Sequence, residues 1–228
     1  MRWDPAKFWR ESRAFILFVV VMLLFRSAIA DWNQVPSGSM YPSIYIGDRI
    51  VVDKLAYDLR VPFTLQRIAR WEQPQRGDVV TFQSPVDGRL LVKRVVGVPG
   101  DTVELNNNRL AINGVPASYE PLSRSEVRKL PAVQSTRYEF FTESLLGSKR
   151  RVMLSRSPLS RGAPIIKVKV PPDQFLMLGD NRDNSQDFRA IGFVDRDLIL
   201  GRAESVAFSL DYDHYYQPRL NRFLTPLI

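Results

Sequence analysis

The sequence predicts a mainly β fold, in which an antiparallel β core carries an inserted smaller β lobe and follows one N-terminal transmembrane helix. One long apolar run, residues 14–25, lies near the N-terminus. After it, short stretches rich in β-branched and aromatic residues alternate with turns containing glycine, proline and asparagine, a pattern typical of all-β domains. A more polar region, residues 105–170, separates two groups of such stretches. These three observations define the predicted segments.

Composition narrows the class of protein. A chain of 228 residues is long enough for one large or two small domains. Its 32 basic and 24 acidic residues give a net charge of +8, but the only dense basic run is Lys149-Arg150-Arg151. An anionic membrane surface explains scattered positive charge at least as well as nucleic acid does, and we expect no nucleic-acid partner. The absence of cysteine excludes a thiol nucleophile, a disulfide and a cysteine-based zinc site.

The N-terminal residues predict a membrane anchor. Residues 1–13 include four basic residues, which favour the cytoplasmic side of a membrane, so we assign them to a cytoplasmic N-terminus. Residues 14–30 form the predicted transmembrane helix, whose length of roughly 26 Å is at the short limit for crossing a bilayer. A cleavable signal peptide is the alternative, because Ala28-Ile29-Ala30 before Asp31 has the small-residue pattern of a cleavage site.

The β core is predicted in two parts, residues 31–104 and residues 171–210. Turn residues such as Pro99-Gly100-Asp101 separate its apolar stretches. The expected strands are residues 49–54, 79–82, 89–97, 174–178 and 198–208.

The remaining residues form a lobe and a tail. Residues 105–170 are expected to form the inserted second β lobe, in which Asn113-Gly114 is a dipeptide typical of a hairpin turn. Residues 211–228 are an aromatic and basic C-terminal tail for which the sequence predicts no element.

Residues 36–44 are the first candidate for a chemical site. They combine three serines, one glycine and two prolines in nine residues. Gly38 is expected to supply backbone freedom, and each proline fixes one backbone angle. Such a stretch forms a rigid elbow that exposes a hydroxyl group, although a serine-rich turn without any chemistry is the ordinary alternative.

Lys93 is the candidate base for that hydroxyl. Leu91 and Val95 share its strand face by the two-residue period, so its amine is expected to lie in apolar surroundings. Burial lowers the pKa of a lysine and allows its amine to accept a proton, whereas a surface lysine paired with an acid would not. His214, the only histidine, is the alternative base for a Ser-His-Asp enzyme.

Residues 179–189 form a third motif, Gly-Asp-Asn-Arg-Asp-Asn-Ser-Gln-Asp-Phe-Arg. Together with residues 36–44 and with residues 77–82 and 93–101, this motif resembles the bacterial type I signal peptidases, and the resemblance extends from the apolar segment to about Arg202. Three acidic residues in the motif also suggest a divalent cation. However, the neighbouring arginines argue against a metal, and the resemblance implies no metal and no cofactor.

The resemblance implies specific roles for residues of this sequence. It makes Ser39 the nucleophile and Lys93 the general base, and it forms an oxyanion hole from the Ser37 hydroxyl and the Ser39 backbone N–H. Ser185 would orient the Lys93 amine. The expected supporting residues are Asp187 and Arg189, and the expected lining of shallow substrate pockets is Val35, Pro36, Met40, Leu91 and Val92. Asp180 to Asn184 are expected to shape the loop.

The resemblance implies that the protein is a membrane-anchored serine endopeptidase, which removes signal peptides from exported preproteins after small-x-small sites. Its expected partners are preproteins and membrane lipid, and its expected location is the bacterial inner membrane, with the catalytic domain on the periplasmic side. The sequence does not predict the oligomeric state.

Three alternatives remain open from the sequence. The first is a related maturation peptidase with one dedicated substrate. The second is a self-cleaving repressor-type Ser–Lys peptidase, against which the apolar segment argues because that protein would be cytosolic. The third is a membrane-anchored β-rich binding protein without catalysis, for which changes at Ser39 or Lys93 would leave function intact.

Overall fold

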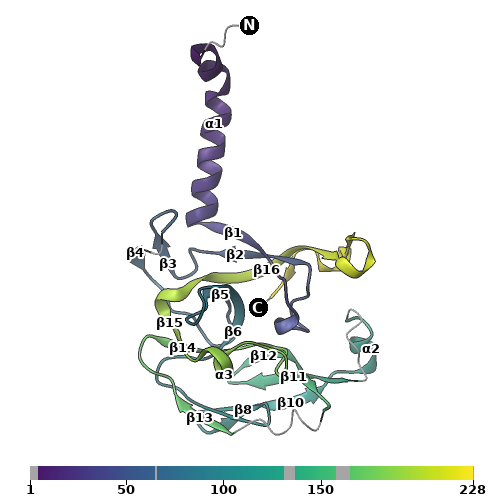
Figure 1. Cartoon of the computed structure of the whole chain (residues 1–228). Coiled ribbons are helices and arrows are strands. Elements are labelled where there is room, and N and C mark those ends of the chain that lie inside the picture. The colour runs from purple at the N-terminus through teal and green to yellow at the C-terminus, as the bar shows by residue number, and fades with distance from the viewer. Residues whose placement is uncertain (1–4, 65, 131–136, 158–164, 228) are drawn as a thin grey trace.

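The computed structural model describes residues 5–64, 66–130, 137–157 and 165–227 of the chain. A long N-terminal helix, α1 (Pro5–Ala28), stands on a body whose regular structure consists mostly of strands (Figure 1). Strand β1 (Ala30–Gln34) follows the helix after one residue, so α1 leads directly into the β body. The mainly β fold expected from the sequence is confirmed.

Helix α1 differs from the expected helix of residues 14–30 at both ends. It begins at Pro5, a residue type favoured in the first turn of a helix, and it ends at Ala28 because Ala30 already pairs with Asp53 of the next strand. Within the described ranges, no helix reaches the length and apolar character that crossing a membrane requires. This finding does not confirm the transmembrane helix expected over residues 14–30. Residues 1–4 of the predicted N-terminal segment lie outside the described residues.

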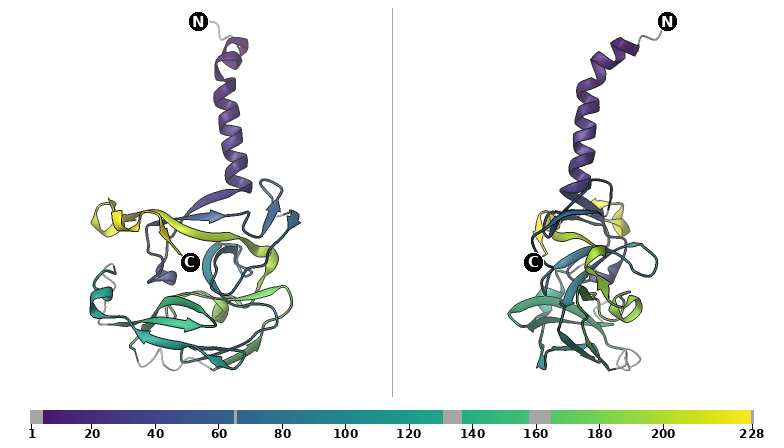
Figure 2. Two further views of the ribbon diagram at one scale, coloured as in Figure 1. Left: turned by 180° about the vertical axis from the view of Figure 1, so that it is seen from behind. Right: turned by 90° about the vertical axis from the view of Figure 1, so that its left-hand side faces the viewer.

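The principal sheet is antiparallel and has nine strands. Seven of them follow the order β1-β2-β16-β5-β6-β14-β15, and two short strands, β17 and β18, also pair with β16. The sheet curls in all three views (Figures 1 and 2), and its inward-facing apolar side chains belong to two buried clusters. The strands after β1 are β2 (Asp48–Asp53), β5 (Val79–Gln83), β6 (Leu90–Gly97), β14 (Gln174–Leu178), β15 (Val194–Asp195), β16 (Ile199–Asp211), β17 (Gln217–Pro218) and β18 (Thr225–Pro226).

Two smaller sheets lie below the principal sheet in Figure 1. One has four strands in the order β13-β7-β8-β9, and the other has three in the order β10-β11-β12. Their elements are β7 (Thr102–Asn106), β8 (Arg109–Ile112), β9 (Val115–Pro116), β10 (Ser118–Pro121), α2 (Arg124–Val127), β11 (Tyr138–Leu145), β12 (Ser148–Ser155) and β13 (Ile166–Lys169).

Pairing of β7 with β13 brings the two ends of this region together. Val103 and Leu110 from the small sheet share a buried cluster with Val96 and Leu176 from the principal sheet, so the two parts pack through one apolar interface. The predicted lobe of residues 105–170 overlaps this region, and its residues 131–136 and 158–164 lie outside the described residues. The predicted domain boundaries stay predictions.

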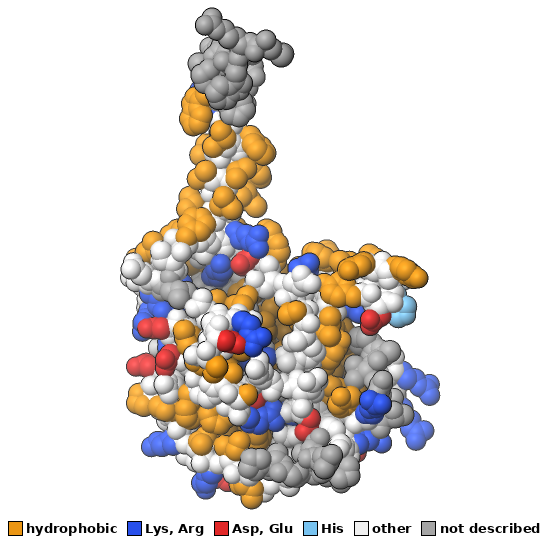
Figure 3. Space-filling view, in the orientation of Figure 1, with side chains coloured by type: hydrophobic (Ala, Val, Ile, Leu, Met, Phe, Trp, Pro, Cys, Tyr) orange, Lys and Arg blue, Asp and Glu red, His pale blue; other side chains and the backbone are white. Residues whose placement is uncertain are grey.

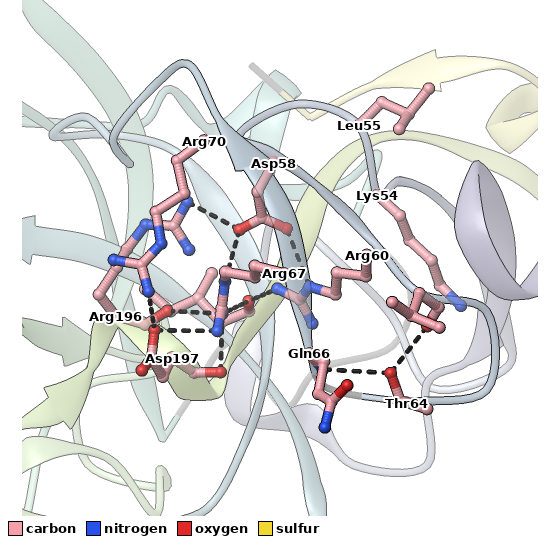
Figure 4. A network of polar contacts seen from close by, with 12 residues as sticks. Lys54, Leu55, Asp58, Arg60, Thr64, Gln66, Arg67, Arg70, Arg196 and Asp197 are labelled. Atoms are coloured by element: carbon pink, nitrogen blue, oxygen red, sulfur yellow. Dashed lines mark hydrogen bonds and ion pairs between the residues drawn. The ribbon is translucent and has the colours of Figure 1, made fainter.

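A hairpin formed by β3 (Asp58–Arg60) and β4 (Arg67–Arg70) lies beside the base of α1 (Figure 1). Its Asp58 carboxylate is buried and forms ion pairs of 2.9 Å with each of Arg60, Arg67 and Arg196, and the network is shown in Figure 4. Although burial alone would raise the pKa of Asp58, the hydrogen bonds from Arg60 and Arg67 lower it. The network fixes the hairpin to the 3-10 turn Arg196–Leu198, which precedes β16.

The C-terminal tail is part of the fold. Besides contributing β17 and β18, it packs against the loop that follows the serine-rich stretch: Arg219 donates to Ile46 O at 3.0 Å, and Arg222 donates to Ser43 O at 2.9 Å. Arg222 also forms an ion pair with the buried Asp48. The two arginines therefore connect the tail, for which the sequence predicted nothing, to residues 43–48.

Candidate active site

The serine-rich stretch forms a tight elbow, as its composition predicted. Gly38–Met40 is a single 3-10 turn, in which Tyr41 N donates to Gly38 O at 3.1 Å. Gly38 has no positive φ angle, so backbone freedom is not why glycine is present. A Cβ atom at Gly38 would lie 2.5 Å from Cδ2 of Tyr41, and glycine is needed because the tyrosine ring occupies that space. The buried side chain of Met40 anchors the turn and leaves Ser39 half-exposed.

Lys93 reaches the elbow from β6. Its Nζ lies 2.8 Å from Ser39 Oγ and 3.0 Å from Val92 O. The side chain is 2% exposed, which confirms the burial predicted from the strand period. Burial lowers the pKa of Lys93 to about 8, and the charges of Asp187 and Asp180 oppose that shift. The site therefore joins a serine hydroxyl to an amine that loses its proton close to neutral pH.

The loop after β14 holds the elbow in place from the other side. Asn181 N donates to Ser39 O at 3.1 Å, and Asn181 Nδ2 donates to Gly38 O at 3.1 Å. A Cβ atom at Gly179 would lie 2.5 Å from Ser39 O and 2.2 Å from Ser185 Oγ, so only glycine allows this approach. Sequence reasoning assigned Asn181 to loop shape alone, and no local signal marks its contact with a turn some 140 residues earlier.

The acidic residues near Lys93 are bound to arginines. Asp187 caps the short helix α3 (Phe188–Ile191), accepts from Gly179 N at 3.0 Å, and receives two hydrogen bonds of 2.8 Å from Arg189. Asp180 receives hydrogen bonds of 2.9 and 2.8 Å from Arg94. Asp187 and Arg189 thus form the predicted pair, whereas no role was predicted for Arg94.

The two other predicted serines differ in their contacts. Ser37 is exposed, and its Oγ donates to Ser39 Oγ at 3.4 Å. Ser185 lies against Gly179, but within the described part of the chain its buried Oγ has no hydrogen-bond partner. The expected bond from Ser185 to the Lys93 amine is therefore not formed, and that amine instead contacts Ser39 Oγ and Val92 O.

The residues expected to line substrate pockets fall into two groups. Val35 and Met40 are 3% and 1% exposed and belong to the apolar core beneath the elbow. Pro36 is exposed, and Leu91 and Val92 are partly buried. Only Pro36, Leu91 and Val92 expose surface to a ligand in this structure. Val35 and Met40 belong to the core beneath them.

His214 and the acidic loop residues have other partners. His214 is 71% exposed in its side chain and lies 3.1 Å from Asp211 in the C-terminal tail. Asp183 accepts from Asn108 Nδ2 at 2.7 Å and from Ser155 N at 2.6 Å. Among the described residues, no cluster of acidic or histidine side chains has the arrangement of a metal site.

Comparison with known proteins gives consistent findings. A family model described as "Signal peptidase, peptidase S26" matches residues 8–208. A protein named Signal peptidase I from Pseudomonas fluorescens is 36% identical over 206 residues, covering 85% of this chain and 69% of that protein. Signal peptidase I from Pseudomonas aeruginosa is 35% identical with the same coverage. A crystal structure of a signal peptidase I from Enterococcus faecalis is 30% identical and covers 57% of this chain and 97% of that chain, with a TM-score of 0.34.

Proposed function

The chain belongs to the signal peptidase family, peptidase S26, and is a serine endopeptidase of that type; on this basis we propose that it removes signal peptides from exported preproteins with Ser39 as nucleophile and Lys93 as general base. The observation that carries the proposal is the 2.8 Å contact between Ser39 Oγ and the buried Nζ of Lys93. A hydroxyl group needs such a base to attack a peptide bond.

The proposed reaction begins with a neutral Lys93. Its amine accepts the Ser39 proton as Oγ bonds to the scissile carbonyl carbon, and the electron pair of the C=O bond moves to oxygen. The resulting ammonium then donates the proton to the leaving amine, and the C–N bond breaks. In the second half of the reaction Lys93 takes a proton from water, and the oxygen of that water bonds to the ester carbonyl carbon. The bond from that carbon to Ser39 Oγ then breaks as Lys93 returns the proton to Oγ, which releases the acid product and Ser39.

The oxyanion is proposed to bind the Ser39 backbone N–H and the Ser37 hydroxyl. The position of Ser37 supports this role, because its Oγ is exposed and lies 3.4 Å from the Ser39 oxygen. One donor of this kind typically contributes about 3 kcal/mol to the transition state. The substrate is proposed to contact Pro36, Leu91 and Val92, whose small exposed surfaces suit small side chains at the cleavage site.

Ser185 is proposed to act once the reaction has started. Its buried hydroxyl has no partner among the described residues, a costly state for a polar group. It lies against Gly179, which itself packs on Ser39 O. We assign it the orientation of the Lys93 ammonium that forms after proton transfer.

Membrane attachment through α1 is part of the proposal. Its apolar side chains are exposed along the helix, as Figure 3 shows, including Phe15 (69%), Leu17 (63%) and Phe18 (60%), and water-exposed apolar surface of this extent is typical of a membrane or protein contact. We place the N-terminus in the cytoplasm and the β body on the periplasmic side of the bacterial inner membrane. Alkaline extraction of membranes tests the anchor: release of the full chain into the supernatant would contradict it.

Cleavage of a preprotein in detergent tests the mechanism. The wild type and the His214→Ala control are expected to cut after a small-x-small site, whereas Ser39→Ala and Lys93→Ala are expected to be inactive. Activity should rise with pH through about 8, as the Lys93 amine loses its proton. Retained activity in Lys93→Ala would place the base elsewhere. A folded wild type that cuts no preprotein would instead favour a single dedicated substrate.

A further inference from the structure

A basic hollow of about 550 Å³ lies between the principal sheet and the three-stranded sheet. It adjoins the far end of the serine-rich stretch at Pro42 and Ser43, and strand β18 forms another wall. Its lining includes six basic side chains but only one acidic side chain, that of Asp78. The basic residues are Arg76, Arg94, Lys149, Arg150, Arg151 and Arg222.

Three of these arginines are buried and come from separate parts of the chain. Arg94 on β6 is 5% exposed, Arg150 on β12 is 7% exposed, and Arg222 in the 3-10 turn Leu220–Arg222 is 8% exposed. Long-range folding brings these groups together at one hollow, so they differ from mobile surface charges.

Each of these buried arginines has a carboxylate partner: Asp180 for Arg94, Glu143 for Arg150 and Asp48 for Arg222. Glu143 forms ion pairs with both Arg150 and Arg182, so one carboxylate serves two guanidinium groups. Although burial would raise the pKa of Glu143, Arg182 and Arg150 lower it to about 2. Burial lowers the pKa of Arg150, and the charge of Glu143 opposes that shift. The inner wall is therefore close to charge balance, but the buried Nε of Arg222 has no hydrogen-bond partner among the described residues and can donate to an anion.

The rim of the hollow adds two exposed basic side chains. Lys149 and Arg151 flank Arg150 on β12 and are exposed, and Arg151 has only a 3.7 Å contact with Glu126. The three residues form the dense basic run of the sequence, Lys149-Arg150-Arg151. Strand alternation directs the middle residue inward and its neighbours outward. The run thus supplies both a fixed inner cation and two cations at the entrance.

We propose that this hollow binds a phosphate-bearing group, either in a soluble phosphate ester or in the headgroup of an anionic phospholipid. An anionic phosphate group accepts several hydrogen bonds, and the guanidinium groups of arginine match it well. The volume exceeds that of one phosphate and admits an attached alcohol. A nucleic-acid backbone, by contrast, needs an open basic surface rather than a hollow of this size. Arg222 also donates to Ser43 O, so the ligand contacts residues that support the elbow.

Binding is testable without proteolysis, on the full-length Ser39→Ala protein in detergent. The probe is glycerol 3-phosphate, compared with glycerol and with sodium chloride at equal ionic strength. At ten times its Kd the probe should raise Tm by about 3 to 6 °C. Lys149→Gln/Arg151→Gln should weaken its binding about tenfold. Lys167→Gln/Lys169→Gln removes the same charge from the exposed face of β13 and should leave binding unchanged.

Vesicles distinguish the two sources of phosphate. If binding to phosphatidylglycerol vesicles, but not to phosphatidylcholine vesicles, falls in the rim variant and not in the β13 control, the ligand is a lipid headgroup. If only glycerol 3-phosphate shows this dependence, the ligand is soluble. If neither probe does, or if the two double variants lose binding equally, the hollow is not a phosphate site and the proposal is refuted. None of these outcomes depends on the proposed peptidase activity.

Discussion

Replacing Lys93 by methionine is expected to abolish cleavage and to stabilise the fold. The pKa of Lys93 falls from 10.5 to about 8 on folding, chiefly because of burial. At neutral pH this difference corresponds to a cost of about 3 kcal/mol, since each pKa unit represents about 1.4 kcal/mol. Methionine loses the contacts with Ser39 and Val92, which together contribute about 1 kcal/mol. The expected gain is about 2 kcal/mol, or roughly 4 to 8 °C in Tm.

The stabilisation should depend on pH in a defined direction. Below pH 8 the amine is protonated in both states, so the full cost of burying the charge is present. Between about pH 8 and 10.5 the folded protein holds a neutral amine while the unfolded chain is still protonated. The free energy of unfolding of the wild type therefore rises across this window, and the advantage of Lys93→Met shrinks as the pH approaches 10.5.

Thermal unfolding followed by circular dichroism at pH 7, 9 and 10 measures this effect. Lys169→Met, which changes an exposed lysine on β13, is the control and should change Tm little at any of these pH values. A Lys93→Met protein that is less stable than the wild type at pH 7 would refute the reasoning. So would a stabilisation that stays constant up to pH 10, because the buried amine would then not be the source.

Three further changes test the rest of the site. Ser37→Ala should lower kcat about 10²- to 10³-fold with little change in KM, and Ser37→Thr, which keeps a hydroxyl, should recover much of the loss; equal losses in both variants would contradict the oxyanion role. Gly179→Ala should reduce kcat about 100-fold, because the added Cβ atom would displace the backbone carbonyl of Ser39. Unchanged steady-state kinetics would show that the loop can move to accommodate the Cβ atom without displacing Ser39. Arg189→Gln should shift the rising limb of the pH–rate profile to above pH 8, because the Asp187 charge then acts on Lys93 without its cationic partner. If the midpoint of that limb does not change, the pair is only structural.

The strands could be predicted from local sequence because their signals are local. The strand Gln174–Leu178 has the predicted bounds, and Lys93 is buried as its apolar neighbours predicted, although residues 93–97 of β6 are all buried and do not alternate. The turn at Asn113-Gly114 joins β8 to β9, as the dipeptide predicted. In each case neighbouring residues in the chain determine the outcome.

Contacts between distant segments could not be predicted in this way. Arg94 and Asp180 are 86 residues apart, and Asn181 reaches Gly38 across 143 residues. A polar residue in a loop has the same local signature whether it binds a distant carbonyl or faces water. For the same reason no element could be assigned to the C-terminal tail from the sequence, although Arg222 binds it to the loop after the elbow.

The base at Lys93 depends on how the surrounding charges are distributed. Two carboxylates, of Asp187 and Asp180, are near enough to raise the pKa of Lys93, and an unneutralised acid beside the amine would hold the proton that it must release. Arg189 and Arg94 each bind one of these acids with two charge-assisted hydrogen bonds. The same acids are needed for geometry, because Asp187 binds Gly179 N and Asp180 precedes the residue that holds the elbow. The arginines therefore allow carboxylates to position the loop while burial still determines the protonation of Lys93.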